Sequence, residues 1–371
     1  MLRSSLIILP LLRACLAEQT VLASDAAFVT PVGRPYPAAT QGALGLSWLG
    51  GGVRVSFTGR ALRATFAPTL VGFKIRVTQS VSGYFPVQGV VWVLGSNASE
   101  TVPIASSNAA GGAVVAELVL NVDAQYFESA GPGSLATLLS LTTDGSFGAA
   151  PPPPSVVMHV IGDSITAATN IHGGVNNNCA DGGFQCDYSA SWGGLLCGHF
   201  GASCSAIAVG SQTVPSMTAY YQQWRFASSE PFPFNDTAPQ VFAAYLGVND
   251  MWGQNQSAAL DATFAANWLV FFNLVKAKYP AAKVKFFLLL GPMVAGGGLP
   301  ASPRKMEPGV LKAVADGVAA GFDVTYVNAT GACGPSECTA RARVLSCART
   351  FVTRRALLSP TDREAAIVRH Y

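Results

Sequence analysis

The residue types best suited to catalysis in this chain stand directly after short apolar runs. Ser164, Gly210 and Asn249 each follow such a run, the first within Gly162-Asp163-Ser164 and the last within Gly247-Val248-Asn249-Asp250. A serine at the carboxyl end of a buried strand has its Oγ beside free backbone amides, an arrangement that attack on an ester carbonyl requires. We therefore expect Ser164 to be a nucleophile, with the amides of Ser164, Gly210 and Asn249 binding the oxyanion.

Each of these residues also has a purely structural interpretation. Ser164 would then cap a helix, Gly210 would serve a turn, and Asn249 would be an ordinary loop amide. The functional interpretation rests on all three together, because parallel strands end at the same edge of a sheet.

The elements that must position these residues lie within residues 155–338. Apolar strands are expected at 156–161, 206–209, 241–246, 284–290 and 324–327. Helical segments alternate with them. The clearest is expected at 257–278, ending before Pro280, and a shorter one at 307–321, where Pro308 marks the start and Gly321 the stop. This alternation predicts a three-layer α/β domain built on a parallel sheet.

Residues 18–150 are expected to form a separate domain, because from about residue 43 to residue 143 the hydrophobic pattern has a different period. Apolar and polar residues alternate, as in Val53-Arg54-Val55-Ser56-Phe57 and Leu62-Arg63-Ala64-Thr65-Phe66, with turn signals between the runs. This pattern is typical of an antiparallel, jelly-roll-like β-sandwich, for which we expect seven or eight strands. The prolines at 151–154 are expected to separate the two domains as a stiff linker, since proline cannot donate to a sheet.

The motifs resemble those of the SGNH, or GDSL-type, hydrolases. Ile161-Gly162-Asp163-Ser164-Ile165-Thr166 is similar to their nucleophile block, and Leu246-Gly247-Val248-Asn249-Asp250 is similar to their third block. Ahead of them, Gly45-Leu46-Ser47-Trp48 and residues 53–59 resemble the jelly-roll domain of the second family of carbohydrate esterases. The resemblance covers about residues 28–332. It implies removal of acetyl groups from xylan and related polysaccharides, with no metal and no other cofactor, although lipid esters stay open because SGNH sites accept many acyl groups.

The histidine that this resemblance calls for is missing from its usual place. The family has its general base in an Asp-X-X-His stretch soon after the fifth strand, and this chain contains no Asp-X-X-His. His370, next to the last residue, is the candidate base that remains. His159 suits a core position, His199 a helix end, and His172 a loop that follows the nucleophile.

Residues 339–371 differ in composition from the rest, being rich in arginine and free of lysine. One hypothesis is that this tail comes from a mis-joined exon or a truncation, so that transcript sequencing would give another ending with Asp-X-X-His. If the tail is genuine, we expect a catalytically impaired homologue that acts as a carbohydrate-binding protein.

Several features predict a secreted, extracellular protein. Residues 1–17 are typical of a signal peptide cut near Ala17, with a lipoprotein-type signal at Cys15 as the alternative. Cysteines close in sequence favour disulfides over a tetrahedral metal site, the expected pairs being Cys179 with Cys186, Cys197 with Cys204, and Cys333 with Cys338. Asn-X-Ser/Thr sequons occur at Asn97, Asn235, Asn255 and Asn328, and would carry glycans only in a eukaryotic secretory pathway.

The charge and the apolar runs limit the partners. The net charge is +3, and the arginine excess is confined to the tail, so no nucleic-acid surface is expected. After the signal, no run is long enough to predict a membrane span. The expected partner is an acetylated polysaccharide or another small acyl ester, and no oligomeric state is indicated. Trp192 and Trp252 are expected either to stack on a sugar ring or to pack, and the loop at 170–191 is expected to form a rim of the cleft.

Overall fold

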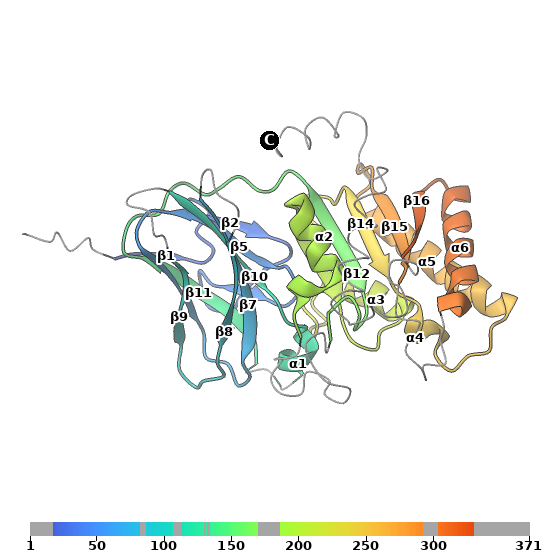
Figure 1. Cartoon of the computed structure of the whole chain (residues 1–371), viewed down its shortest axis with the longest axis horizontal. Coiled ribbons are helices and arrows are strands. Elements are labelled where there is room, and N and C mark those ends of the chain that lie inside the picture. Colours follow the sequence, from blue (N-terminus) through green and yellow to red (C-terminus); the bar gives the residue numbers. More distant parts are fainter. Residues whose placement is uncertain are drawn as a thin grey trace, which may run out of the picture.

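The computed structural model describes residues 18–81, 87–106, 113–129, 131, 134–169, 186–291 and 303–329. Two antiparallel sheets come first along the chain, and a parallel sheet flanked by helices follows (Figure 1). The fold class predicted from the sequence, an all-β sandwich followed by a three-layer α/β domain, is thereby confirmed.

The sandwich packs a six-stranded sheet against a five-stranded sheet. The six-stranded sheet has the order β3-β4-β11-β6-β9, with β1 also paired to β11, and the other sheet has the order β2-β5-β10-β7-β8. The strands are β1 (Gln19–Leu22), β2 (Val29–Val32), β3 (Tyr36–Pro37), β4 (Leu44–Leu46), β5 (Gly52–Phe57), β6 (Ala61–Phe66), β7 (Phe73–Val81), β8 (Val87–Val93), β9 (Glu100–Ser106), β10 (Val114–Leu120) and β11 (Ala136–Thr143).

Alternation along β5 and β6 produces the core of the sandwich. Val53, Val55 and Phe57 are fully buried, while Arg54 and Ser56 between them are only partly covered. Phe66 and Phe73, from opposite sheets, meet edge to face with ring centroids 5.3 Å apart. The alternation of apolar and polar residues in the sequence therefore reflects strands whose side chains point in turn to the buried and the outer face of the sheet.

The number of strands in the sandwich was underestimated from the sequence. The strands that were not expected are short or interrupted, as in β3, which has two residues, and β9, which contains Pro103. β9 pairs only with β6 and so lies at the edge of its sheet, where a proline is tolerated. Short edge strands show too few alternations to be recognised by period.

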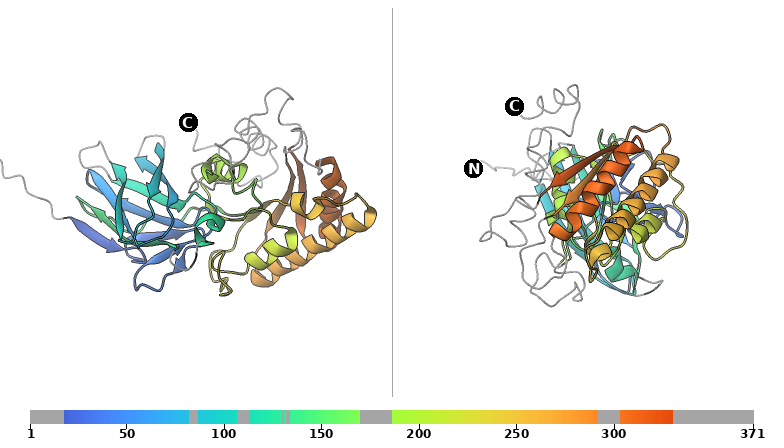
Figure 2. Two further views of the ribbon diagram at one scale, coloured as in Figure 1. Left: turned by 90° about the horizontal axis from the view of Figure 1, so that it is seen from below. Right: turned by 90° about the vertical axis from the view of Figure 1, so that its right-hand side faces the viewer.

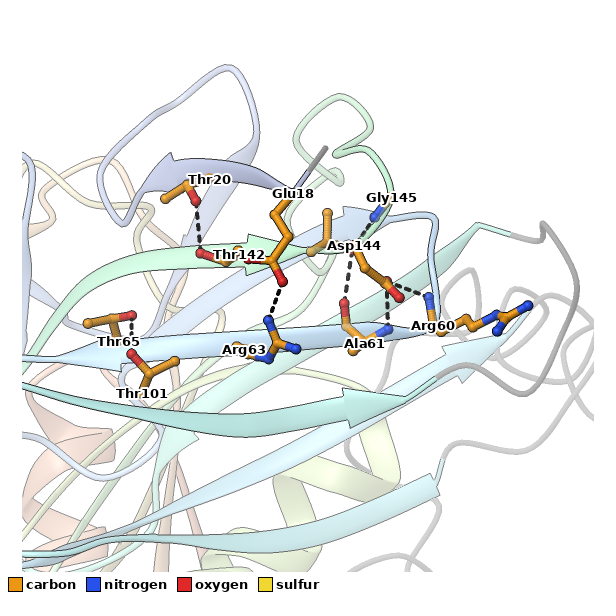
Figure 3. Close-up of polar contacts among 11 residues, drawn as sticks. Glu18, Thr20, Arg60, Ala61, Arg63, Thr65, Thr101, Thr142, Asp144 and Gly145 are labelled. Carbon is orange, nitrogen blue, oxygen red and sulfur yellow. Dashed lines mark hydrogen bonds and ion pairs between the residues drawn. The ribbon is translucent and has the colours of Figure 1, made fainter. Parts of the chain in front are cut away.

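The outer surface of the six-stranded sheet is held by polar cross-strand contacts (Figure 3). Thr65 and Thr101 share a hydrogen bond of 2.9 Å, and Thr20 and Thr142 share another of the same length. Asp144 accepts the amide N–H groups of Arg60 and Ala61, and these bonds lower the pKa of its carboxyl, the Ala61 bond most. These contacts tie neighbouring strands of the sheet together.

The α/β domain has a parallel sheet of order β13-β12-β14-β15-β16. Helix α2 covers one face of this sheet, while α3, α5 and α6 cover the other (Figure 2). The strands are β12 (Val157–Gly162), β13 (Ser203–Ala208), β14 (Val241–Tyr245), β15 (Lys285–Leu290) and β16 (Asp323–Asn328). The helices are α2 (Trp192–Phe200), α3 (Val214–Tyr220), α4 (Val248–Met251), α5 (Ala258–Lys278) and α6 (Pro303–Ala319), with a 3-10 turn at Tyr188–Ala190.

The two long helices lie close to their predicted bounds. α5 begins after Ser257, whose hydroxyl accepts the Leu260 N–H, and it ends before Pro280. α6 begins at Pro303, earlier than predicted, because Pro308 lies within the helix and is not at its start. By length and composition α5 is also apolar enough to cross a membrane, but such a helix is equally typical of a core, and its aromatic side chains pack against the sheet.

The disulfide between Cys197 and Cys204 is present as predicted, with Cα atoms 6.1 Å apart, and it joins α2 to β13. Cys186 is also disulfide-bonded. Cys179, Cys333 and Cys338 lie outside the described residues, so those pairings stay predictions.

Candidate active site

Ser164 lies just past the carboxyl end of β12, in a tight turn. The turn is wound like a helix, since Ala167 donates to the Asp163 carbonyl at 2.9 Å and Thr169 to the Ser164 carbonyl at 2.9 Å. Gly162 permits this turn, because a Cβ on it would lie 1.8 Å from the Thr166 hydroxyl. Ser164 is half-buried, and its backbone N–H has no hydrogen-bond partner among the described residues.

Gly210 lies beside Ser164. A Cβ placed on Gly210 would be 3.9 Å from the Cβ of Ser164, so the ends of β12 and β13 converge as predicted. The Gly210 N–H donates to Oδ2 of Asp123 at 3.2 Å. The next residue, Ser211, has a φ of 61°, a conformation that L-residues adopt only when the surroundings hold it. The proposed oxyanion amide thus belongs to a strained and well-anchored loop.

Asn249 lies in α4 at the end of β14. Gly247, with a φ of 130°, turns the chain into this helix, and a Cβ there would approach Met306 to 2.7 Å. The Asn249 side-chain amide donates to Oδ2 of Asp163 at 3.3 Å and to the Gln212 carbonyl at 2.9 Å. Asn249 therefore links the turn of Ser164 to the loop of Gly210, so the three predicted site residues come from adjoining loops.

Buried carboxyls surround this junction. Desolvation, with a smaller contribution from the nearby Asp250, raises the pKa of Asp163 to about 7, although the Ile165 N–H bond lowers it. Desolvation likewise raises the pKa of Asp123 to about 7, and that of Asp250 to about 6. Asp250 accepts the Val214 N–H at 3.1 Å and so fixes the start of α3. These carboxyls hold loop amides in place, and each does so at a cost in desolvation.

Neither described histidine lies in this junction. His159 lies within β12, is 1% exposed and bonds Tyr221 Oη through Nδ1 at 3.1 Å, and its burial lowers the pKa of the imidazole well below the usual value. His199 lies in the last turn of α2 and packs edge to face on Phe200. His172 and His370 lie outside the described residues, so the assignment of His370 as the base stays a prediction.

The two tryptophans differ in role. Trp192 is 4% exposed at the start of α2, where its indole N–H donates to the Thr166 hydroxyl, so it packs and does not present a ring to solvent. Trp252 is 47% exposed directly after α4. The rim loop predicted at 170–191 is described only from Cys186 onward.

Asp123 and Gln125 are site residues that the sequence did not reveal. Both belong to the sandwich half of the chain, at the start of the short helix α1 (Ala124–Glu128) (Figure 1). Asp123 binds the Gly210 amide, and Oε1 of Gln125 lies 2.9 Å from where a Cβ on Gly210 would be. No spacing rule relates a residue of one domain to a loop of the other, so only the tertiary structure could identify them.

The fold and the junction define a class: a sandwich joined to a three-layer α/β domain with a serine at the carboxyl end of the first parallel strand. No family model matches the chain, and no curated protein matches it. Among the described residues no cluster of histidine, cysteine and acidic side chains is suited to a metal ion.

Solved structures share this fold. A family two carbohydrate esterase from Cellvibrio japonicus is 17% identical, with a TM-score of 0.70 over 95% of this chain and 98% of that one. A family two carbohydrate esterase from Clostridium thermocellum, in complex with cellohexaose, is 19% identical, with a TM-score of 0.68 over 87% and 97%. An acetyl xylan esterase from Butyrivibrio proteoclasticus is 15% identical, with a TM-score of 0.65 over 84% and 89%. The predicted resemblance to the two-domain carbohydrate esterases is confirmed at the level of the fold.

Proposed function

We propose that this chain is a secreted serine esterase that removes acetyl or other short acyl groups from polysaccharide through a Ser164 acyl-enzyme. The observation that carries the proposal is the meeting of Ser164, Gly210 and Asn249 in adjoining loops at the carboxyl ends of β12, β13 and β14. The Ser164 N–H supports it, because this amide has no hydrogen-bond partner among the described residues and lies beside the proposed nucleophile, where it can receive an oxyanion.

The reaction would run in two displacements. Ser164 Oγ bonds to the acyl carbon and gives its proton to an imidazole base, while the carbonyl π electrons move onto the oxygen. Collapse breaks the bond to the sugar oxygen, which takes the proton from the imidazolium. Water, activated by the same base, then releases the acid and regenerates the serine. His370 is the proposed base.

The substrate class is supported by the neighbours and by one exposed ring. Solved structures with this fold include an acetyl xylan esterase and an esterase complexed with cellohexaose. Trp252 is large, exposed and adjacent to the Asn249 loop, which suits stacking on a sugar ring. We therefore place the acetylated sugar between Ser164 and Trp252.

The test is acetate release from acetylated xylan and from 4-nitrophenyl acetate by the purified wild-type protein and by Ser164→Ala. We expect the variant to lose at least about 1000-fold in kcat, because serine supplies the covalent step. Ser155→Ala, in the linker region, is the matched control and should keep full activity. His370→Ala should resemble Ser164→Ala if His370 is the base. Equal rates for wild type and Ser164→Ala would refute the esterase.

A second candidate is a carbohydrate-binding protein without turnover. It is favoured by the fact that the Gly210 and Asn249 N–H groups already donate to the carboxyls of Asp123 and Asp163. Calorimetry with cellohexaose and with xylan oligosaccharides separates the two candidates. Binding that persists in Ser164→Ala and is lost in Trp252→Ala, with no acetate release by wild type, would establish this one.

A further inference from the structure

Helix α1 brings polar groups of the sandwich to the nucleophile of the other domain. Its position is fixed at both ends, since Asp123 Oδ2 accepts the Gly210 N–H at 3.2 Å and Glu128 Oε2 accepts the Ala227 N–H at 2.9 Å. Asp123 is fully buried, and its other oxygen accepts the Gln125 N–H at 2.9 Å. The backbone of Gln125 is therefore held rigidly against the Gly210 loop.

The side chain of Gln125 reaches the Gly210 loop, which also adjoins Ser164. A point one bond from Gly210 Cα, where a Cβ would lie, is 2.9 Å from Gln125 Oε1 and 3.9 Å from Ser164 Cβ. The Gln125 side chain is half-buried and has no hydrogen-bond partner among the described residues. A primary amide carries two donors and two acceptor sites, and a half-turn about its last bond exchanges the oxygen and nitrogen.

The donors around Ser164 thus fall into two groups. The Gly210 N–H and both protons of the Asn249 amide already have acceptors. The Ser164 N–H and the Gln125 amide have none among the described residues. Of these groups, the Ser164 N–H and the Gln125 amide are therefore free to donate to a new acceptor without first breaking a hydrogen bond to another described residue.

We propose that Gln125, supplied by the sandwich domain, is a catalytic residue of the α/β domain's site, donating its side-chain amide to the acyl oxygen as Ser164 attacks. The inference rests on the proposed esterase function and assigns one group within it. The Gln125 donor acts with the Ser164 N–H, and Asp123 is the positioning residue that holds α1 and the Gly210 loop together. The sandwich is then part of the catalytic site and more than a neighbour of it.

The test compares Gln125→Met, which keeps the length of the side chain but has no donor, with Gln125→Glu, which keeps its shape but presents an acceptor. Steady-state kinetics on 4-nitrophenyl acetate should show kcat lowered about 100-fold in Gln125→Met, with KM within about twofold, as loss of one oxyanion donor requires. Gln125→Glu should lose at least as much, because its charge faces the developing oxyanion. Gln79→Met, on β7 of the same domain, is the matched control and should retain wild-type kinetics.

The outcomes separate the two proposals. Far-UV circular dichroism and melting temperatures identify any variant that loses activity by unfolding, and Gln125→Asn, which keeps the amide on a shorter stem, should recover part of the rate. A wild-type protein that turns over substrate and a folded Gln125→Met with the same kcat would overturn this inference alone. A wild-type protein no faster than Ser164→Ala would overturn the esterase and this inference with it.

Discussion

The Asp163 carboxyl joins the segments that follow two neighbouring strands, β12 and β14. One carboxylate oxygen holds the Ile165 N–H and shapes the turn of Ser164, while the other holds the Asn249 amide. The carboxyl is 1% exposed, so these bonds are formed at the expense of solvation. Its role is to keep the turn of Ser164 and the Asn249 amide in fixed relation, which an exposed aspartate could not do as firmly.

This burial predicts a pH dependence of stability. The pKa of Asp163 is raised from 3.8 to about 7 by burial, so the folded protein keeps a proton that the unfolded chain releases. Its contribution to stability is full below about pH 4 and is lost as the pH rises through 7. The free energy of unfolding of Asp163→Asn, from urea titrations at pH 4.5 to 7.5, should therefore decline less with pH than that of wild type.

Other groups do not obscure this comparison. Asp123 and Asp250 contribute with the same sign as Asp163, and buried His159 contributes with the opposite sign below its usual pKa. Asp123 and His159 are present in both proteins, so their contributions cancel in the difference, whereas the titration of Asp250 is coupled to that of Asp163 and forms part of the measured effect. Parallel stability curves for the two proteins would contradict the assignment of a raised pKa to Asp163.

The element scale is where the sequence was most informative. The α5 helix was predicted within one residue, since Ser257 caps its start and Pro280 follows its end. Strands β12 to β15 were recognised by their apolar runs, which follow from burial on both faces of a parallel sheet. The edge strand β16 was also recognised, although it is only partly buried. Helix α1 could not be predicted, because its five residues give little periodicity and its position depends on Gly210 and Ala227 of the other domain.

The disulfide between α2 and β13 gives a prediction at this scale. The bond between Cys197 and Cys204 closes a short loop, and closing such a loop restricts the unfolded chain. Replacing both cysteines by alanine should lower the free energy of unfolding by about 2 to 3 kcal/mol. Urea titrations of the double variant measure this loss of stability. A single substitution on the preceding turn, such as Ser189→Ala, would not be a suitable control, because the Ser189 hydroxyl donates a hydrogen bond to Asp187.

A better control for the disulfide is wild type in reducing agent, where the Cys186 bond also breaks. The free energy of unfolding of the double variant should lie between those of oxidised and reduced wild type. A double variant as stable as oxidised wild type would show that the loop between α2 and β13 is already restricted in the unfolded chain.

At the scale of the whole molecule, Arg34 fastens the sandwich to the α/β domain. Its guanidinium is buried and donates to the Tyr221 carbonyl at 2.7 Å. It also lies 4.2 Å from the centre of the Tyr221 ring and 4.0 Å from that of Phe232. Cation–π contacts and one charged hydrogen bond thus act across this interface, while Nε and Nη2 of Arg34 are buried without a hydrogen-bond partner among the described residues.

Removal of the Arg34 side chain should therefore lower the stability of the folded protein. Arg34→Ala is expected to lower the free energy of unfolding by about 3 kcal/mol, from the lost charged hydrogen bond and the lost ring contacts. Arg60→Ala, an exposed arginine of the sandwich, should change it by less than about 0.5 kcal/mol. Similar losses in the two variants, measured by urea titration, would contradict a specific role for Arg34.

The contact between Leu49 and Ala206 has a consequence for the solubility of the separate parts. β13 is the edge strand of the parallel sheet, and the sandwich loop pairs with it when Ala206 donates to the Leu49 carbonyl at 2.8 Å. An uncovered edge of this kind offers unpaired amides to any other chain that can add a strand. The sandwich thus protects its neighbour against aggregation, and an α/β domain expressed alone would tend to self-associate through β13.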